Sequence, residues 1–227
     1  NINKKIILVL SCCVQGFPHE LSKNDNKNYI KFINENNNIL KVYCQNYDLD
    51  YKHSKIKPII LGIDYHTSNL SPLEQEKQLL SIYRNSKPFE LRMNKCYSFF
   101  QFQMFDRHDK DRYRAKEALD KTNFNVYQNQ KLSRQETWNN MIKYKWIISP
   151  HGNGLDCHRT YEAIALGCIP VVRSSTLDIL YEDMPIIIVK DWNELSLNLL
   201  MSKTHEALNK NKNKITLKYW NDKIKQI

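Results

Sequence analysis

Short apolar runs alternate with longer amphipathic segments along most of the chain. The apolar runs are rich in aliphatic, β-branched or aromatic residues, and we expect strands at residues 4–13, 39–46, 55–64, 95–104, 123–129, 145–149, 168–173 and 184–190. The segments between them favour helices at residues 26–38, 71–86, 109–122, 133–144, 155–167, 175–182 and 191–203. Strands that alternate with helices indicate βαβ units, so the pattern predicts an α/β fold with parallel sheets.

Helix-boundary signals sharpen this prediction at three places. Ser71 followed by Pro72 is typical of an N-cap and first helical position. Ser133 with Glu136 three residues on forms a capping-box pattern. Gly167 should end a helix, because glycine readily adopts the backbone conformation that follows a last helical turn.

The length of 227 residues suits one large domain or two small ones. A break near residue 125 gives two small α/β halves. We therefore predict an N-terminal half at 1–125, a C-terminal half at 126–202, and a C-terminal helix at 203–227 that crosses back to the first half.

Composition limits the functional classes. The formal charge of +10 favours anionic partners, but the lysines are scattered and no nucleic-acid-binding motif is present, so we expect no specific nucleic-acid binding. The six cysteines contain no CxxC pair, which favours a reducing compartment. No apolar run reaches the roughly 20 residues of a membrane span. We expect a cytoplasmic protein, or one of the Golgi lumen if a targeting segment has been removed.

The stretch SPHGNGLDCHRTYEA, residues 149–163, carries the clearest candidate chemistry. It follows an apolar run at the point where parallel sheets bind ligands, and its glycines allow backbone N–H groups to approach an anion. We expect the next helix to begin near Leu155, with Asp156 in its first turn and Arg159 and Glu162 on successive turns.

One simpler interpretation stays open for this stretch, and a metal site is disfavoured. The glycines can form an ordinary turn, with Asp156 and Arg159 as a helical ion pair. The histidines and cysteines at 151, 157, 158 and 168 fit no zinc-binding spacing, so we expect no metal site.

The sequence from Tyr144 to Trp192 resembles the C-terminal half of exostosin-like (GT47-type) glycosyltransferases. The resemblance lies in the glycine turn, the Arg-x-x-Glu-Ala step, the Gly-Cys-Ile-Pro-Val run and the final Asp-Trp. The chain is more similar still to short exostosin-related proteins of large DNA viruses, algae and bacteria, which implies a viral source and the host cytoplasm as an expected location.

The resemblance implies a GT-B-like fold, in which two Rossmann-like halves with parallel sheets face each other, here with a reduced N-terminal half. It implies a glycosyltransferase that moves a hexosyl or pentosyl group from a nucleotide sugar, UDP-linked, to a glycan or glycoconjugate acceptor. Such transfer would invert the linkage and need no metal or other cofactor. The alternative is a catalytically silent nucleotide-sugar or glycan-binding module.

The resemblance also assigns site residues. The turn and the following helix would bind the donor diphosphate, with Arg159 neutralising it and Glu162 accepting from the ribose. The expected donor-binding set is His151, Gly152, Asn153, Gly154, Asp156, Arg159, Glu162, Arg173, Ser174, Ser175 and Arg112. Arg107 and Arg114, together with Arg112, would reach the phosphates from across the cleft, or all three would form the solvated face of a helix.

An inverting transferase also needs a base within hydrogen-bond reach of the acceptor hydroxyl. Two polar segments of the N-terminal half offer candidates, with His108 beside the second, and the base candidates are Asp64, His66 and Asp106. Loop polarity or helix capping explains each of these residues equally well.

Overall fold

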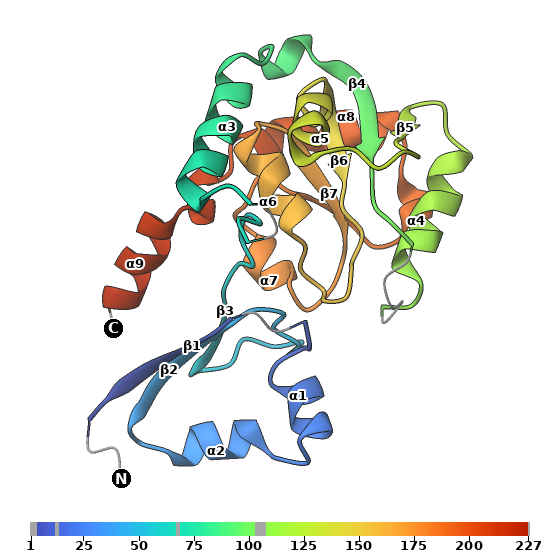
Figure 1. Cartoon of the computed structure of the whole chain (residues 1–227). Helices are drawn as coiled ribbons and strands as arrows, with labels where there is room; N and C mark the ends of the chain where they lie inside the picture. The colour runs from blue at the N-terminus through green and yellow to red at the C-terminus, as the bar shows by residue number, and fades with distance from the viewer. Residues whose placement is uncertain (1–3, 12–13, 67–68, 103–107, 227) are drawn as a thin grey trace.

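Two parallel sheets organise the chain, which the computed structural model describes at residues 4–11, 14–66, 69–102 and 108–226. Figure 1 shows one lobe around each sheet, with α7 facing the smaller lobe. This confirms the predicted GT-B-like α/β class, two halves with parallel sheets of which the N-terminal half is reduced.

The smaller lobe contains the N-terminal strands in the order β1-β2-β3. Its elements are β1 (Ile6–Leu10), α1 (His19–Asn24), α2 (Tyr29–Glu35), β2 (Ile39–Cys44) and β3 (Ile56–Pro58). Ile33 of α2 is buried in the same core as Val42 of β2. A three-stranded sheet is small, so this lobe depends on packing against the rest of the chain.

The larger lobe has five parallel strands in the order β5-β4-β6-β7-β8. Its strands are β4 (Met93–Ser98), β5 (Asn125–Tyr127), β6 (Tyr144–Ile148), β7 (Ile169–Arg173) and β8 (Ile187–Val189). Its helices are α3 (Pro72–Arg84), η1 (Phe89–Leu91), α4 (Asp111–Asp120), α5 (Arg134–Met141), α6 (His158–Ala165), α7 (Asp178–Tyr181), η2 (Trp192–Glu194), α8 (Leu197–Leu208), η3 (Lys212–Ile215) and α9 (Leu217–Lys225). This order is that of a doubly wound sheet, which binds ligands beyond the carboxyl ends of its strands.

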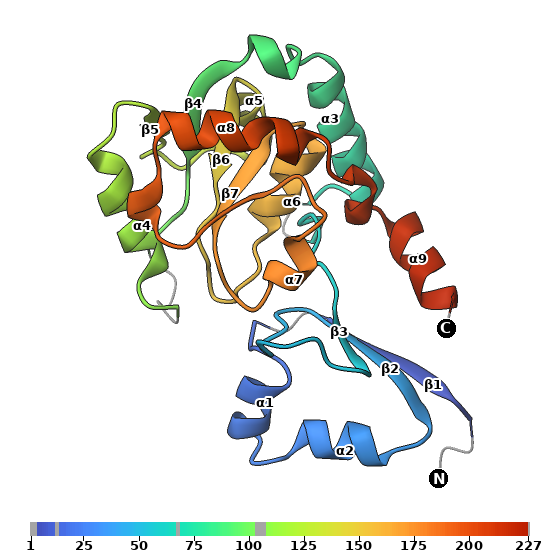
Figure 2. The ribbon, with the colours of Figure 1, turned by 180° about the vertical axis from the view of Figure 1, so that it is seen from behind.

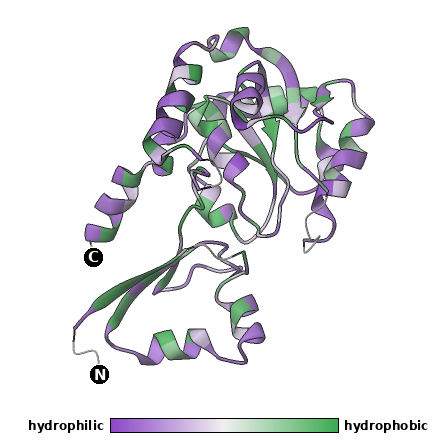
Figure 3. Cartoon of the chain, in the orientation of Figure 1, coloured by the Kyte–Doolittle hydropathy of each residue, from purple (hydrophilic) through white to green (hydrophobic). Residues whose placement is uncertain are grey.

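Helices cover both faces of the larger sheet (Figures 1 and 2). Trp146 and Ile148 of β6 pack with α4 and α8, whereas Ile147 packs with α3, α5 and α6. Successive side chains of a strand point to opposite faces, so a strand covered on both sides must be continuously apolar. Figure 3 shows this pattern as hydrophobic central strands beneath helices of mixed character.

The local boundary signals are confirmed. Ser71 and Ser133 each accept from a backbone N–H and complete a capping box, with Glu74 and Glu136 respectively. Gly167 has φ 71° and follows α6, as expected for a glycine after a helix.

The expected start of the helix after the glycine turn is wrong. α6 begins at His158 with Cys157 as its N-cap, three residues beyond Leu155. Asp156 therefore precedes the helix instead of lying in its first turn. The reason is that the Asp156 carboxylate accepts from the Cys157 N–H and holds this segment in an extended conformation.

The expected division near residue 125 does not coincide with the division between the sheets. β4 and β5 both belong to the larger sheet, and β5 runs through residue 125. The sheets instead separate between β3 and β4. Similarly, α8 crosses the expected boundary at 202 and 203.

The closing segment packs against the smaller lobe. Trp220 of α9 is 5% exposed and lies edge-on to Tyr43 of β2, with ring centroids 6.3 Å apart. The same apolar core also contains Tyr161 of α6 and Leu180 of α7. Continuous packing therefore joins the two lobes.

Candidate active site

A cavity of about 730 Å³ lies between the two lobes at the carboxyl ends of their strands. The smaller lobe contributes Asn46, which follows β2, and part of the segment 61–66, which follows β3. The larger lobe contributes Phe99 after β4, residues near the start of α5, and the segment from Gly152 into α6. This is the place where open α/β sheets bind ligands.

The glycine turn forms one wall of the cavity. Gly152, Asn153 and Gly154 all line it, and the Gly152 N–H donates to the Gly154 carbonyl at 3.0 Å. A Cβ on Gly154 would lie 2.6 Å from Asn46 Oδ1, and one on Gly152 would lie 2.7 Å from Arg112 Nη2. Neither glycine has a positive φ, so any need for glycine comes from close packing. The need is stronger at Gly154, where the neighbouring Asn46 is buried, than at Gly152, where the neighbour is the end of a long side chain.

Asp156 joins the two lobes beneath this turn. It is 3% exposed and accepts from the Leu61 N–H at 2.9 Å and from the hydroxyls of Tyr161 and Tyr181. Its own N–H donates to Asn46 Oδ1 at 2.8 Å. Burial raises the pKa of Asp156, and these hydrogen bonds oppose that effect. Asp156 lines the cavity, but its oxygens are already engaged.

Arg159 brings a buried positive charge to the same wall. Its guanidinium lies 5.1 Å from the ring centroid of Phe99 and 5.8 Å from that of Phe100. Nη1 reaches the Pro150 carbonyl at 3.5 Å, and the buried Nε has no hydrogen-bond partner among the described residues. Burial lowers the pKa of Arg159, yet a guanidinium stays charged at neutral pH.

Arg112 of α4 is the second guanidinium beside the turn. Its Nε donates to the His151 carbonyl at 3.1 Å and Nη1 to the Gln101 carbonyl at 2.6 Å. Within the described part of the chain, neither Arg112 nor Arg159 pairs with a carboxylate. Backbone carbonyls orient both groups without neutralising them, so both can attract an anion. Arg114 instead pairs with Asp109 and does not line the cavity, and Arg107 lies outside the described residues.

Glu162 lies one turn along α6 from Arg159 and also lines the cavity. It is 8% exposed. Burial raises the pKa of Glu162, while the Trp138 indole, Arg134 and Arg159 lower it. A buried carboxylate with spare acceptor capacity suits a ligand that carries hydroxyl groups.

Two of the three base candidates lie together where the segment after β3 lines the cavity. His66 Nδ1 is 3.0 Å from Asp64 Oδ1, and Arg134 pairs with Asp64 Oδ2 at 2.8 Å. The third candidate, Asp106, lies outside the described residues. An imidazole oriented by a carboxylate through Nδ1 keeps Nε2 available as a proton acceptor.

His158 faces this pair and completes a cluster that sequence reasoning missed. Its ring centroid is 5.6 Å from that of His66, and its Nδ1 lies 2.7 Å from the Gly62 carbonyl. One ligand atom from each of Asp64, His66 and His158 lies within 4.8 Å of the others. These three residues have the donor types that can hold a divalent cation such as zinc.

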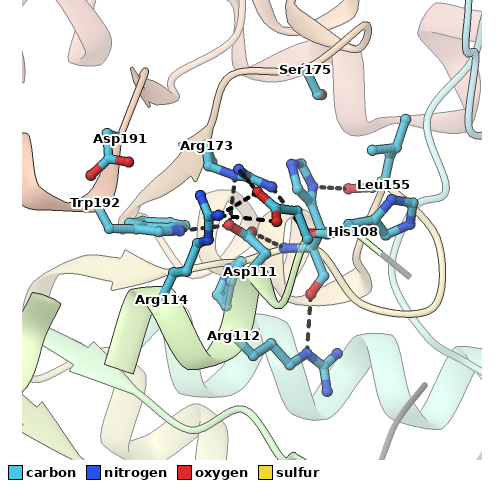
Figure 4. Close-up of polar contacts among 12 residues, drawn as sticks. His108, Asp111, Arg112, Arg114, Leu155, Arg173, Ser175, Asp191 and Trp192 are labelled. Carbon is cyan, nitrogen blue, oxygen red and sulfur yellow. Dashed lines mark hydrogen bonds and ion pairs between the residues drawn. The ribbon is translucent and has the colours of Figure 1, made fainter. Parts of the chain in front are cut away.

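Asp111 organises the back of the turn (Figure 4). It is 1% exposed and accepts from the His151 N–H at 2.8 Å and from Trp192 Nε1 at 2.7 Å. Arg173 Nε lies 2.6 Å from its Oδ1. His151 and Arg173 thus support the turn from behind, and neither is among the residues that line the cavity.

Ser174 and Ser175 serve a different element. Ser174 Oγ donates to Asp178 at 2.5 Å, and the Ser175 N–H donates to the same carboxylate at 3.0 Å. Both serines therefore stabilise the start of α7, and neither lines the cavity.

Sequence reasoning also missed Asn46 and Arg134. Asn46 is 2% exposed and has φ 50°, a conformation that asparagine adopts more readily than most residues. The sequence signal that could have identified Asn46 as a site residue was its position just after an apolar strand. Arg134 follows the cap Ser133, so its position appeared to be that of an ordinary first-turn residue.

None of the helices in the described ranges is long and apolar enough to cross a membrane. The described cysteines, Cys44, Cys96, Cys157 and Cys168, are free thiols. Burial raises the pKa of Cys157, the one that lines the cavity, so it favours the neutral thiol.

Comparison with known proteins places this geometry in a family. No curated protein matches the chain. Among solved structures, the crystal structure of an alpha1,3-fucosyltransferase is similar over 93% of this chain and 82% of its own, with 12% identity and a TM-score of 0.43. The model of the RXYLT1 C-terminal domain matches residues 102–227, which include α4, the glycine turn, Arg159 and Glu162. The chain therefore belongs to the RXYLT1 C-terminal domain family, a family of glycosyltransferases.

Proposed function

We propose that the protein transfers a sugar from a nucleotide-sugar donor, UDP-linked, to a hydroxyl of a glycan acceptor. The observation that carries this proposal is the pair of guanidiniums, Arg159 and Arg112, that flank a glycine turn in an interlobe cavity without carboxylate partners among the described residues. Two fixed positive charges beside a backbone turn suit a diphosphate. We also propose that the protein is a GT47-type glycosyltransferase and that it is related to the viral and algal proteins that its sequence resembles.

The proposed donor lies along the wall formed by the turn and α6. Its diphosphate contacts the turn and both guanidiniums, and its ribose hydroxyls donate to Glu162. The hard part of glycosyl transfer is the negative charge that develops on the departing diphosphate. Positive charges that are held in place before the reaction stabilise this negative charge without reorganisation. Arg159 and Arg112 thus supply the charge neutralisation that a metal ion would otherwise provide.

The proposed acceptor approaches from the side of Asp64 and His66. His66 Nε2 accepts the proton of the acceptor hydroxyl while Asp64 holds Nδ1, at 3.0 Å. The hydroxyl oxygen attacks the anomeric carbon as its bond to the diphosphate oxygen breaks, and the electron pair leaves with the nucleotide. Attack from the face opposite the leaving group inverts the linkage.

Binding and turnover are tested separately. UDP-sugars should raise the melting temperature of the wild type, and Arg159→Ala should weaken this binding at least tenfold, because a charge-assisted hydrogen bond to a phosphate is among the stronger ones. Arg114→Ala is the matched control, since that arginine is 49% exposed and pairs with Asp109 away from the cavity. If no nucleotide sugar stabilises the protein, the proposed donor site is wrong.

Transfer to simple sugar acceptors tests catalysis. Glu162→Ala should reduce donor binding, whereas His66→Ala should reduce the rate while donor binding stays near the wild-type value. Donor binding with no transfer or donor hydrolysis would leave the alternative function, a silent nucleotide-sugar-binding module.

A further inference from the structure

A second cavity, of about 430 Å³, lies between the smaller sheet, α7 and α9. It shares no lining residue with the candidate active site. Figures 1 and 2 show α9 extending from the larger lobe toward the smaller one, and the contact between Trp220 and Tyr43 fixes it against β2.

Five lysines line this cavity, from β2, β3, η3, α9 and the segment between β2 and β3. Lys41 precedes Tyr43 by two residues on β2, and Lys57 of β3 is in register with Tyr43. All three side chains therefore lie on one face of the sheet, the face that Trp220 covers. Lys223 comes from α9, and Lys52 and Lys214 complete the set.

The positive charge of this cavity exceeds the negative charge that pairs with it. Lys52 is 3.6 Å from Glu182, with both side chains exposed, and Lys214 pairs with Asp183. The other three ammonium groups pair with no carboxylate in the described ranges of the chain. Their partners are uncharged oxygens: the Ser54 carbonyl for Lys41 at 2.8 Å, the His53 carbonyl for Lys57 at 2.6 Å, and the Tyr219 hydroxyl for Lys223 at 3.3 Å.

Holding like charges together in a partly buried cavity costs free energy, which a bound anion would offset. Burial lowers the pKa of Lys57, and the charges of Lys41, Lys223 and Lys52 lower it further. The charged form of Lys57 is thus disfavoured in the protein alone. An anion would reverse this effect, since an opposite charge nearby favours the ammonium.

We propose that this cavity is a second anion site, which binds a phosphoryl or sulfuryl group through Lys41, Lys57 and Lys223. Ammonium groups are point charges that suit such oxyanions. The volume exceeds that of the oxyanion alone, so the group can be a free ion or an ester carried on a sugar. The site is independent of the proposed donor site.

Isothermal titration calorimetry at constant ionic strength tests the proposal with inorganic phosphate, sulfate, glucose 6-phosphate and neutral glucose. We expect saturable binding of the anions and none of glucose. In Lys41→Gln/Lys57→Gln, affinity should fall at least tenfold. Lys218→Gln/Lys225→Gln removes the same charge from α9 residues that do not line the cavity and should leave affinity unchanged. Tighter binding of the sugar phosphate than of phosphate would identify an ester as the ligand, and equal binding a free ion.

An Arg159→Gln variant separates this site from the donor site, and it should keep phosphate binding. The proposal is overturned if no anion binds saturably, if both lysine pairs have the same effect, or if only Arg159→Gln abolishes binding. The proposal is also overturned if a short DNA duplex binds and phosphate does not, because the lysines would then belong to a surface that binds polyanions.

Discussion

Gly154→Ala should destabilise the protein strongly although nothing about the backbone of this residue demands glycine. Its φ is not positive, so an alanine can adopt the conformation. The added Cβ would lie 2.6 Å from Oδ1 and 2.8 Å from Cγ of Asn46. Asn46 is buried and accepts from the Asp156 N–H at 2.8 Å, so it cannot move without breaking a contact between the lobes.

The magnitude follows from these contacts. Leaving the buried Asp156 N–H without an acceptor costs about 1–3 kcal/mol. Forcing a methyl group into a packed site costs about 1–3 kcal/mol. The lower entropy of the unfolded alanine chain returns about 0.4–1 kcal/mol. We expect a net loss of about 1–5.5 kcal/mol, and a melting temperature lower by roughly 2–20 °C.

Urea denaturation of Gly154→Ala and Gly152→Ala measures the effect. At Gly152 the new Cβ meets the end of the Arg112 side chain at 2.7 Å and Cys157 Sγ at 3.3 Å. Because the end of a long side chain can move, the loss should stay below about 1.5 kcal/mol. Asn46→Gly removes the obstructing side chain, and Gly154→Ala in that background should cost about 1 kcal/mol or less. A loss below about 0.5 kcal/mol for Gly154→Ala in the wild type would refute the reasoning.

Three further predictions concern pH, the support of the turn, and metals. His53 Nδ1 accepts from the N–H groups of Lys55 and Ile56, and burial lowers the pKa of His53. Neutral His53 therefore stabilises the fold above the pKa of an unfolded histidine, near 6.5. This stabilisation is lost as the pH falls, by at most about 1.4 kcal/mol per pH unit. Urea denaturation at pH 7.5 and 5.5 should show a smaller pH dependence in His53→Gln, and equal dependence would contradict this. Asp111→Ala should cost about 3–5 kcal/mol in the same assay, because it leaves the buried His151 N–H and Trp192 Nε1 without an acceptor and takes from Arg173 the nearer of its two carboxylates. Exposed Asp120→Ala should cost less than about 0.5 kcal/mol, and similar losses for the two variants would refute that role. Transfer should survive EDTA, and loss of activity that zinc restores would instead assign a metal to the Asp64, His66 and His158 cluster.

Features that depend on neighbouring residues were predictable from the sequence. The capping boxes at Ser71 and Ser133 involve residues three apart, and Gly167 acts within its own helix end. The strands β6 and β7 are buried on both faces, so their apolar runs are continuous and easily recognised. For the same reason the glycine turn was placed correctly at the end of β6.

Features that depend on distant partners were not predictable. Asp156 appeared to belong to a helix because its partners Leu61 and Tyr181 are far away in sequence. Asp111 appeared to be an ordinary polar residue at a helix start, since Trp192 Nε1 is contributed by a residue 81 positions later. The division between the lobes was misplaced because periodicity identifies strands but does not say which sheet each strand joins.

The most direct test of the central claim is a structure of the protein soaked with UDP. The account predicts the diphosphate against the turn at residues 152–154 and beside Arg159 and Arg112, with the ribose against Glu162. UDP bound elsewhere, or no UDP at a concentration that saturates binding in solution, would contradict the claim that the interlobe cavity is a nucleotide-sugar donor site.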